Sequence, residues 1–185
     1  MSWFAQFSRR HVWSASIIII VEVYLYRQYA HLGAEFHFWL HGLLGASIGL
    51  LTLAVWRLLT RRAGRISPWE AGVLGHLYSM VPDILFITFG LLHVYWMDVF
   101  AFHIRIHFIH QPVISMLTVF CFSLLAYALS QSGKKRGAVW AGGLAITILL
   151  GSLLLSSPVP QNLSQIQRHS RHYAWLCPMW DESSI

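Results

Sequence analysis

Charged residues are scarce in this sequence of 185 residues. Only 11% are Asp, Glu, Lys or Arg, whereas a typical soluble domain carries about 25%. Hydrophobic residues make up 56% of the chain and include nine tryptophans. This balance excludes an ordinary soluble domain and predicts a polytopic membrane protein. A single helical bundle over residues 1–185 is expected, because no linker or change in composition divides the chain.

Cysteine is equally rare, and its two positions argue against a disulfide framework. Cys121 lies within an apolar run and Cys177 lies in the C-terminal tail. The net charge of +6 comes from short basic clusters between apolar runs, so no nucleic-acid partner is expected. A cleavable signal peptide is not expected either, because no small-residue cleavage site follows the first apolar run. The sequence does not indicate an oligomeric state.

Five apolar segments are predicted to cross the membrane. They are residues 12–26, 38–59, 69–92, 112–130 and 138–155, and a C-terminal tail follows at 156–185. A spanning helix needs about 20 residues, so the short first segment could instead lie at the interface. The stretch 93–111 is richer in polar residues and histidine, and we expect it to form an interfacial helix. The predicted fold is therefore an all-α transmembrane helical bundle.

Basic clusters alternate with these five segments and predict the orientation. They lie at residues 9–10, 57–65 and 134–136, and positive charge concentrates on the cytoplasmic side of membrane proteins. We therefore expect a multi-pass protein of the inner (plasma) membrane with a cytoplasmic N-terminus. The histidines at 31–41 and 93–110 then lie together on the outer side.

Asp83 is the most informative polar residue, because it lies within an apolar run long enough to cross a bilayer. A buried carboxylate needs a cation, a proton or a tight hydrogen-bond partner. The preceding residue, Pro82, lacks a backbone N–H and is predicted to kink the helix there. His76 shares a helix face with Asp83 but lies about 10 Å away along the axis, so the two cannot bind one ion directly.

Two pairs of histidines are spaced four residues apart, His37 with His41 and His103 with His107. This spacing places both rings on one helix face, where they can bind a single ion. Each histidine taken alone is more typical of an amphipathic anchor at the membrane interface. The pairs together with Asp83 favour a metal site.

The order of these motifs resembles that of a known family. Gly75-x6-Pro82-Asp83, Phe89-Gly90, Val99-Phe100 and the His103/His107 pair are similar to motifs of the bacterial membrane-bound, predicted metal-dependent hydrolases, which include LexA-regulated inner-membrane proteins. His41 and the glycines up to Gly49 resemble the early His and Gly-rich span of that family. Pro82-Asp83 resembles its Pro-Asp-x-Asp segment, and His103-Ile-Arg-Ile-His107 resembles its His-Arg-Gly-x-Thr-His-Ser segment.

The resemblance covers residues 41–110 and includes departures. Leu85 replaces the second Asp of the Pro-Asp-x-Asp segment, and the paired histidines are four rather than five residues apart. The family's later His-Ser-x-x-Asp element has no counterpart in the fifth segment. The chain would therefore be a divergent member, in which Asp98 and His93 could replace lost ligands.

The resemblance implies a divalent metal ion, preferably zinc, with His41, Asp83, His103 and His107 as ligands. Asp98 or His93 would act as the general base or would orient a ligand. The implied activity is a metal-dependent hydrolase that acts near the outer face on a lipid-like or phosphorylated substrate.

Three other functions remain open. Membrane di-iron hydroxylases and desaturases also use His-x3-His pairs, but this chain has no His-His doublet and its clusters are expected outside. A haem-bearing electron carrier would need a mid-depth His on each of two spans. A non-catalytic transporter or assembly factor would need only a functional Asp83 in a kinked helix.

Overall fold

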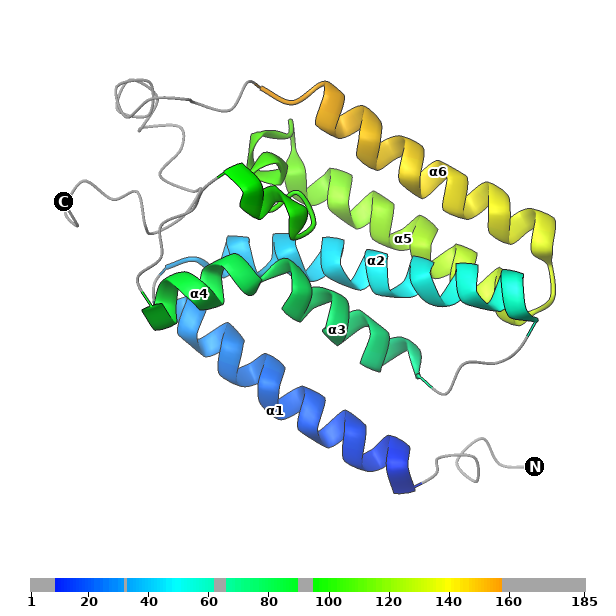
Figure 1. The fold of residues 1–185 in the computed structure, drawn as a ribbon, viewed down its shortest axis with the longest axis horizontal. Coiled ribbons are helices and arrows are strands. Elements are labelled where there is room, and N and C mark those ends of the chain that lie inside the picture. The colour runs from blue at the N-terminus through cyan, green and yellow to red at the C-terminus, as the bar shows by residue number, and fades with distance from the viewer. Residues whose placement is uncertain (1–8, 32, 62–65, 90–94, 158–185) are drawn as a thin grey trace.

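The computed structural model describes residues 9–31, 33–61, 66–89 and 95–157, and all regular elements in these ranges are helices. Figure 1 shows them in chain order: α1 (Arg9–His31), α2 (Glu35–Thr60), α3 (Pro68–Ser79), α4 (Val81–Phe89), the 3-10 helices η2 (Tyr95–Val99) and η3 (Arg105–Phe108), α5 (Pro112–Gln131) and α6 (Lys135–Leu154). The prediction of an all-α fold is confirmed for these residues.

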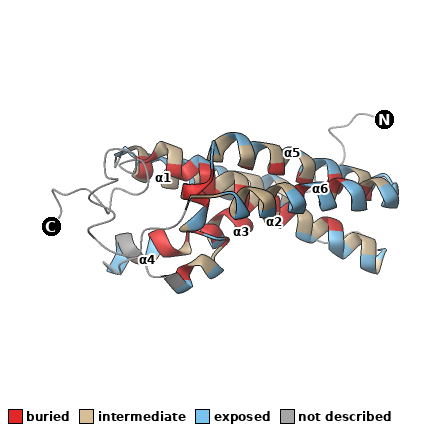
Figure 2. Ribbon diagram, turned by 90° about the horizontal axis from the view of Figure 1, so that it is seen from above, coloured by how far each residue is buried: buried red, intermediate tan, exposed pale blue. Residues whose placement is uncertain are grey.

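Helix α2 lies at the centre of the bundle (Figure 1). It packs against α3 on one side and α5 on the other, and α6 packs mainly on α5. Helix α1 contacts the bundle through α2 and α3. Figure 2 shows buried residues gathered along α2 and α3, whereas α1 and much of α6 are intermediate or exposed.

Three helices in the described part of the chain, rather than the expected five, are long and apolar enough to cross a membrane. They are α2, α5 and α6, which correspond to the predicted segments 38–59, 112–130 and 138–155. The 12–26 segment is part of the longer helix α1, which carries Glu22 and Arg27 within its apolar stretch and is not among the three. Large apolar side chains on α6 such as Trp140 and Leu154 are mostly exposed, as side chains that face lipid would be.

The predicted 69–92 segment is two helices instead of one. Helix α3 ends at Ser79, Met80 leaves helical geometry at φ −95° and ψ 0°, and α4 starts at Val81. Pro82 is the second residue of α4, where its missing N–H costs no helical hydrogen bond. The predicted interruption at Pro82 is therefore confirmed, and it leaves neither α3 nor α4 long enough to cross a bilayer alone.

The His-rich segment is also not the single helix that was expected. Its described part consists of η2 and η3, joined by a turn in which Ala101 and Phe102 have left-handed backbones at φ 59° and 54°. Such conformations are costly for residues other than glycine. Asp98 stabilises the turn, because its carboxylate accepts hydrogen bonds from the N–H groups of Ile104 (2.8 Å) and Arg105 (3.2 Å).

Glycines allow α2 and α3 to pack backbone against backbone. A methyl group added at Gly45 would overlap the carbonyl of Gly75, one at Gly49 would overlap that of Ala71, and one at Gly75 would overlap that of Gly45. Small residues permit this close approach in membrane helices. The glycine contact fixes the position of α3, and so of the residues that follow it, against α2.

Helix α3 starts at a capping box. The Ser67 hydroxyl accepts from the Glu70 N–H, and the Glu70 carboxylate accepts from the Ser67 N–H at 2.7 Å. This second hydrogen bond, which favours the charged carboxylate, holds the pKa of Glu70 below its usual value. The reciprocal pair defines the helix start at the end of the basic 57–65 segment.

Candidate metal centre

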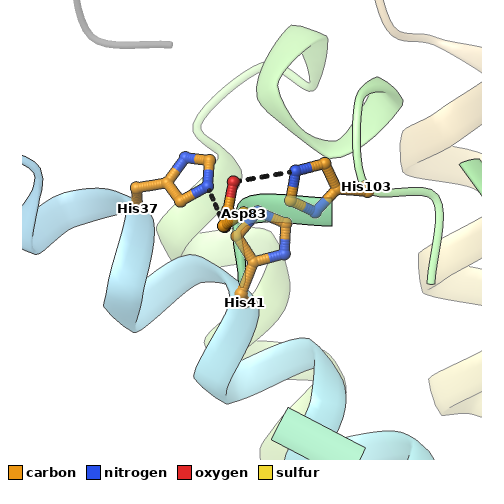
Figure 3. A group of neighbouring side chains, drawn as sticks. All are labelled: His37, His41, Asp83 and His103. Carbon is orange, nitrogen blue, oxygen red and sulfur yellow. Dashed lines mark hydrogen bonds and ion pairs between the residues drawn. The ribbon is translucent and has the colours of Figure 1, made fainter. Parts of the chain in front are cut away.

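Two apolar clusters flank a group of buried polar side chains where α2 begins. One cluster includes Leu40 and Leu44 of α2 with Met116 of α5, and the other joins Tyr29 of α1 to Phe38 and Met80. Between them, His37, His41, Asp83 and His103 are each at most 3% exposed. Figure 3 shows these four side chains converging from α2, from α4 and from the segment before η3.

Asp83 is at the centre of the group. Both of its carboxylate oxygens are engaged: Oδ2 accepts from the Tyr29 hydroxyl at 2.6 Å and lies 2.8 Å from His37 Nε2, and Oδ1 lies 3.2 Å from His103 Nε2. Asp83 lies in the first turn of α4, where the helix dipole favours a negative charge. The break before Pro82 therefore places the Asp83 carboxylate beside His37 in the first turn of α2.

His103 has its ring orientation fixed by the backbone. Its Nδ1 lies 2.9 Å from the carbonyl oxygen of Ser79, and because a carbonyl only accepts, Nδ1 must carry a proton. In the neutral ring Nε2 then presents a lone pair to the Asp83 carboxylate. Two acceptors facing each other require a proton or a cation between them. An N–H donated to a backbone carbonyl is also the usual arrangement behind a metal-bound histidine.

His41 completes the group and has the most unusual environment. Its side chain is fully buried, and neither Nδ1 nor Nε2 has a hydrogen-bond partner among the described residues. Its ring stacks on that of His103 with centroids 4.2 Å apart and lies 4.3 Å from that of His37. Most buried side-chain polar atoms in proteins have a partner. A cation beside the carboxylate would satisfy the one ring nitrogen that carries the lone pair.

The four side chains could hold a metal ion. Each offers one ligand atom, and these three nitrogens and one oxygen all lie within 4.8 Å of one another. Donor atoms around a tetrahedral zinc ion lie about 3.3 Å apart, since each bond is about 2.0–2.2 Å long. Contraction by roughly 1.5 Å or less would therefore close the group around one ion, which rotamer adjustments of the side chains can supply.

Of the four predicted ligands, the structure brings His41, Asp83 and His103 together. His107 is not in the four-residue group but lies beside it. Its half-buried ring stacks on that of His37, and the two ring centroids are 4.5 Å apart. Asp98, predicted as a base or as a group that orients a ligand, uses its carboxylate to hold the 101–105 turn and to pair with the Arg105 guanidinium at 3.1 Å. His93, the other such candidate, lies outside the described residues.

The sequence did not place three residues at this site. The four-residue spacing of His37 from His41 indicated a pair that can bind one ion, but His37 was not included in the predicted ligand set. Tyr29 donates to Asp83 from 54 positions away along the chain, and no local pattern indicates such a contact. Ser79 orients His103 through its carbonyl, and its hydroxyl donates to the carbonyls of His41 and His76.

Replacing Tyr29 with phenylalanine is expected to weaken metal binding by about 10–100-fold, the usual cost of losing a hydrogen bond to a ligand. The change removes the hydroxyl that donates to Asp83 and retains the ring that stacks on His37 at 5.7 Å. Competition with a chelating dye would measure the affinity. Tyr127→Phe is the control, since its hydroxyl accepts a hydrogen bond from the exposed Gln131 near the end of α5. Equal affinities in both variants would show that Tyr29 does not orient a ligand.

Comparison of the chain with protein family models, with curated proteins and with solved structures finds no match. The resemblance to metal-dependent hydrolases therefore stays a prediction from the sequence motifs.

Proposed function

We propose that this protein is a metal-dependent hydrolase of the inner membrane, with one zinc ion bound by His37, His41, Asp83 and His103. The proposal rests on the environment of His41, whose two ring nitrogens are buried and have no hydrogen-bond partner among the described residues. Three imidazoles and one carboxylate form a donor set that suits zinc. His37 replaces His107 in the ligand set that the sequence resemblance implies.

The positions of the basic segments support an outward-facing site. The guanidinium of Arg57, near the end of α2, donates to the carbonyl of Ser130 at the end of α5. Arg57 and the basic segment 134–136 therefore lie at one end of the bundle, and the His/Asp group lies at the start of α2, toward the other end (Figure 1). With the basic end cytoplasmic, the His/Asp group lies in the outer half of the membrane, and the start of α1, where Arg10 pairs with Glu70 of α3, lies on the cytoplasmic side.

A divalent ion held by these four side chains would need an open fifth position, where it would polarise a phosphoryl or carbonyl oxygen and lower the pKa of a bound water. The chain supplies the remaining functions. Asp83 and the three histidines hold the ion, and Tyr29 and Ser79 hold Asp83 and His103 in place. His107, whose ring lies beside His37 and His41, is the nearest candidate for moving a proton. A site at this depth favours a lipid-like or phosphorylated substrate, which matches the substrate class implied by the resemblance.

His107→Gln is expected to retain the metal and to lower hydrolysis by about 10²–10⁴-fold, the usual contribution of a proton-transfer group. The measurement compares turnover of a phosphodiester dye, a phospholipid and a lipid-linked pyrophosphate by the protein in lipid nanodiscs, with metal content determined on the same samples. His110→Gln is the control, since His110 is exposed.

Three outcomes would change the assignment. Loss of metal from His107→Gln would make His107 a ligand. Metal-loaded protein that turns over no substrate would remove the hydrolase activity but leave the metal centre. A protein in which Asp83→Asn abolishes function while His103→Ala does not would be the non-catalytic transporter or assembly factor.

A further inference from the structure

A groove of about 400 Å³ runs along α2. Its walls come from α2, α3 and α5, and α1 contributes Glu22. Apart from Glu22 and His76, all of its lining residues are apolar, aromatic or glycine. Small residues where α2 and α3 meet, including Gly42, Ala46 and Gly72, leave the space open.

One end of the groove carries a buried polar pair. His76 is 4% exposed, and its Nδ1 lies 3.1 Å from the Glu22 carboxylate. Its Nε2 is buried and has no hydrogen-bond partner among the described residues. The ring packs edge-on against Phe38, and a methyl group added at Gly42 would contact it at 3.4 Å. A buried ring nitrogen of this kind needs a hydrogen bond, and the groove is the space from which a ligand can supply it.

The position of the groove determines what fills it. Its α2 wall extends from Phe38 to Leu50, a distance of about 18 Å at 1.5 Å per residue. Two of its three main walls, α2 and α5, belong to helices that are long and apolar enough to cross a membrane. The groove therefore lies at the depth of the lipid chains, and an apolar channel of this length matches one hydrocarbon chain.

We propose that this groove binds one acyl chain of a membrane phospholipid whose headgroup ammonium donates a hydrogen bond to His76 Nε2. The His76 Nδ1–H donates to the Glu22 carboxylate, so Nε2 presents its lone pair to the ligand. The site is separate from the metal centre and does not depend on it, although the two are adjacent: Gly42 follows His41 in the chain, and the Ser79 hydroxyl donates to the carbonyls of both His41 and His76.

The test uses the full-length protein in nanodiscs that contain phosphatidylethanolamine with a photoreactive diazirine on one acyl chain. After illumination, mass spectrometry of peptides locates the label. We expect adducts concentrated on groove residues such as Val73, Leu50 and Phe120. Val73→Trp, which fills the groove, should lower this labelling by at least about tenfold, and His76→Leu should lower it as well. Labelling of the exposed apolar residues of α6, such as Leu144 and Ile146, should not change.

A second variant and two readouts keep the result interpretable. Gly42→Leu fills the same groove from α2, while Gly143→Leu adds the same side chain where nothing lies within 4 Å. Metal content and thermal unfolding show whether each variant is folded. Uniform labelling of groove and α6, or unchanged groove labelling in folded Val73→Trp and Gly42→Leu, would overturn the proposal. Cross-links between two protein chains at these residues would assign the groove to a second copy instead. Loss of metal with retained groove labelling would contradict the proposed function alone.

Discussion

Replacing His41 with alanine is expected to reduce the metal content of the purified protein from about one ion per chain to nearly none. Loss of an outer partner of a ligand already costs about 10–100-fold in affinity, so loss of a ligand that has no other described partner should cost more. His41 is fully buried against His37 and His103, so alanine also leaves the remaining donors without a fourth side chain. Elemental analysis of the protein in detergent gives the content, and titration against a competing chelator gives the affinity.

Metal removal from the wild-type protein provides a second measurement of the same prediction. A ligand at 1,000 times its Kd stabilises the folded state by about 4 kcal/mol, so a chelator should lower the Tm of wild-type protein and leave that of His41→Ala unchanged. Asp83→Asn, which is nearly isosteric and uncharged, should behave like His41→Ala. His110→Ala, on an exposed residue, should retain the ion.

His41→Leu separates the metal centre from a purely structural core. If the His/Asp group only packs, an apolar side chain of similar size at this position should be close to neutral, because no described hydrogen bond is lost. The metal centre predicts full loss of the ion in the same variant. Absence of any transition metal from wild-type protein, together with unchanged stability of the His41 and Asp83 variants, would exclude the centre.

Gly75→Ala is expected to destabilise the bundle by more than about 3 kcal/mol. Overpacking of a core usually costs about 1–3 kcal/mol, and here the added methyl group would overlap the backbone carbonyl of Gly45 rather than a side chain that can rotate away. Helices α2 and α3 would have to separate. Because α3 leads directly to Ser79 and Asp83, this separation should also weaken metal binding.

Gly143→Ala is the matched control for this prediction. Both changes replace a glycine inside a helix with alanine, which favours the helix by about 1 kcal/mol. A methyl group at Gly143 would meet nothing within 4 Å, so this variant should be as stable as the wild type or slightly more so. Thermal unfolding in detergent should show a lower Tm than the wild type for Gly75→Ala and an equal or slightly higher Tm for Gly143→Ala. A Gly75→Ala protein as stable as Gly143→Ala would mean that the helices do not meet at the glycine contact.

The sequence predicted those parts of the fold that depend on long apolar runs. Helices α2, α5 and α6 follow from hydropathy and length, and Pro112 begins α5 as expected. The prediction that 69–92 forms one kinked span was wrong because hydropathy averages over the break at Met80. The expected interfacial helix does not form in the described part of the His-rich segment, because the left-handed residues Ala101 and Phe102 separate η2 from η3. Neither is a residue type that marks such a turn.

At the candidate site, too, the sequence indicated the residues that local patterns mark and missed those that long-range packing brings together. Asp83 was recognised from the cost of burying a carboxylate, and His41 and His103 from their spacing with other histidines. The choice of His37 rather than His107 as the fourth member depends on how the segment after η2 turns back toward α2. That turn is set by the contacts of Asp98 with Ile104 and Arg105, which spacing alone does not reveal. The role of Tyr29 depends on the packing of α1, which is likewise a long-range property.

The four converging side chains come from three segments that leave the ribosome at different times. His37 and His41 are synthesised first, Asp83 follows after α3, and His103 follows last. A nascent chain that ends before the η2–η3 turn therefore has at most three of the four donors. Binding of one ion by all four donors would therefore become possible only after His103 has been synthesised. A chain truncated before this turn would lack one donor and is expected to bind metal more weakly than the complete group.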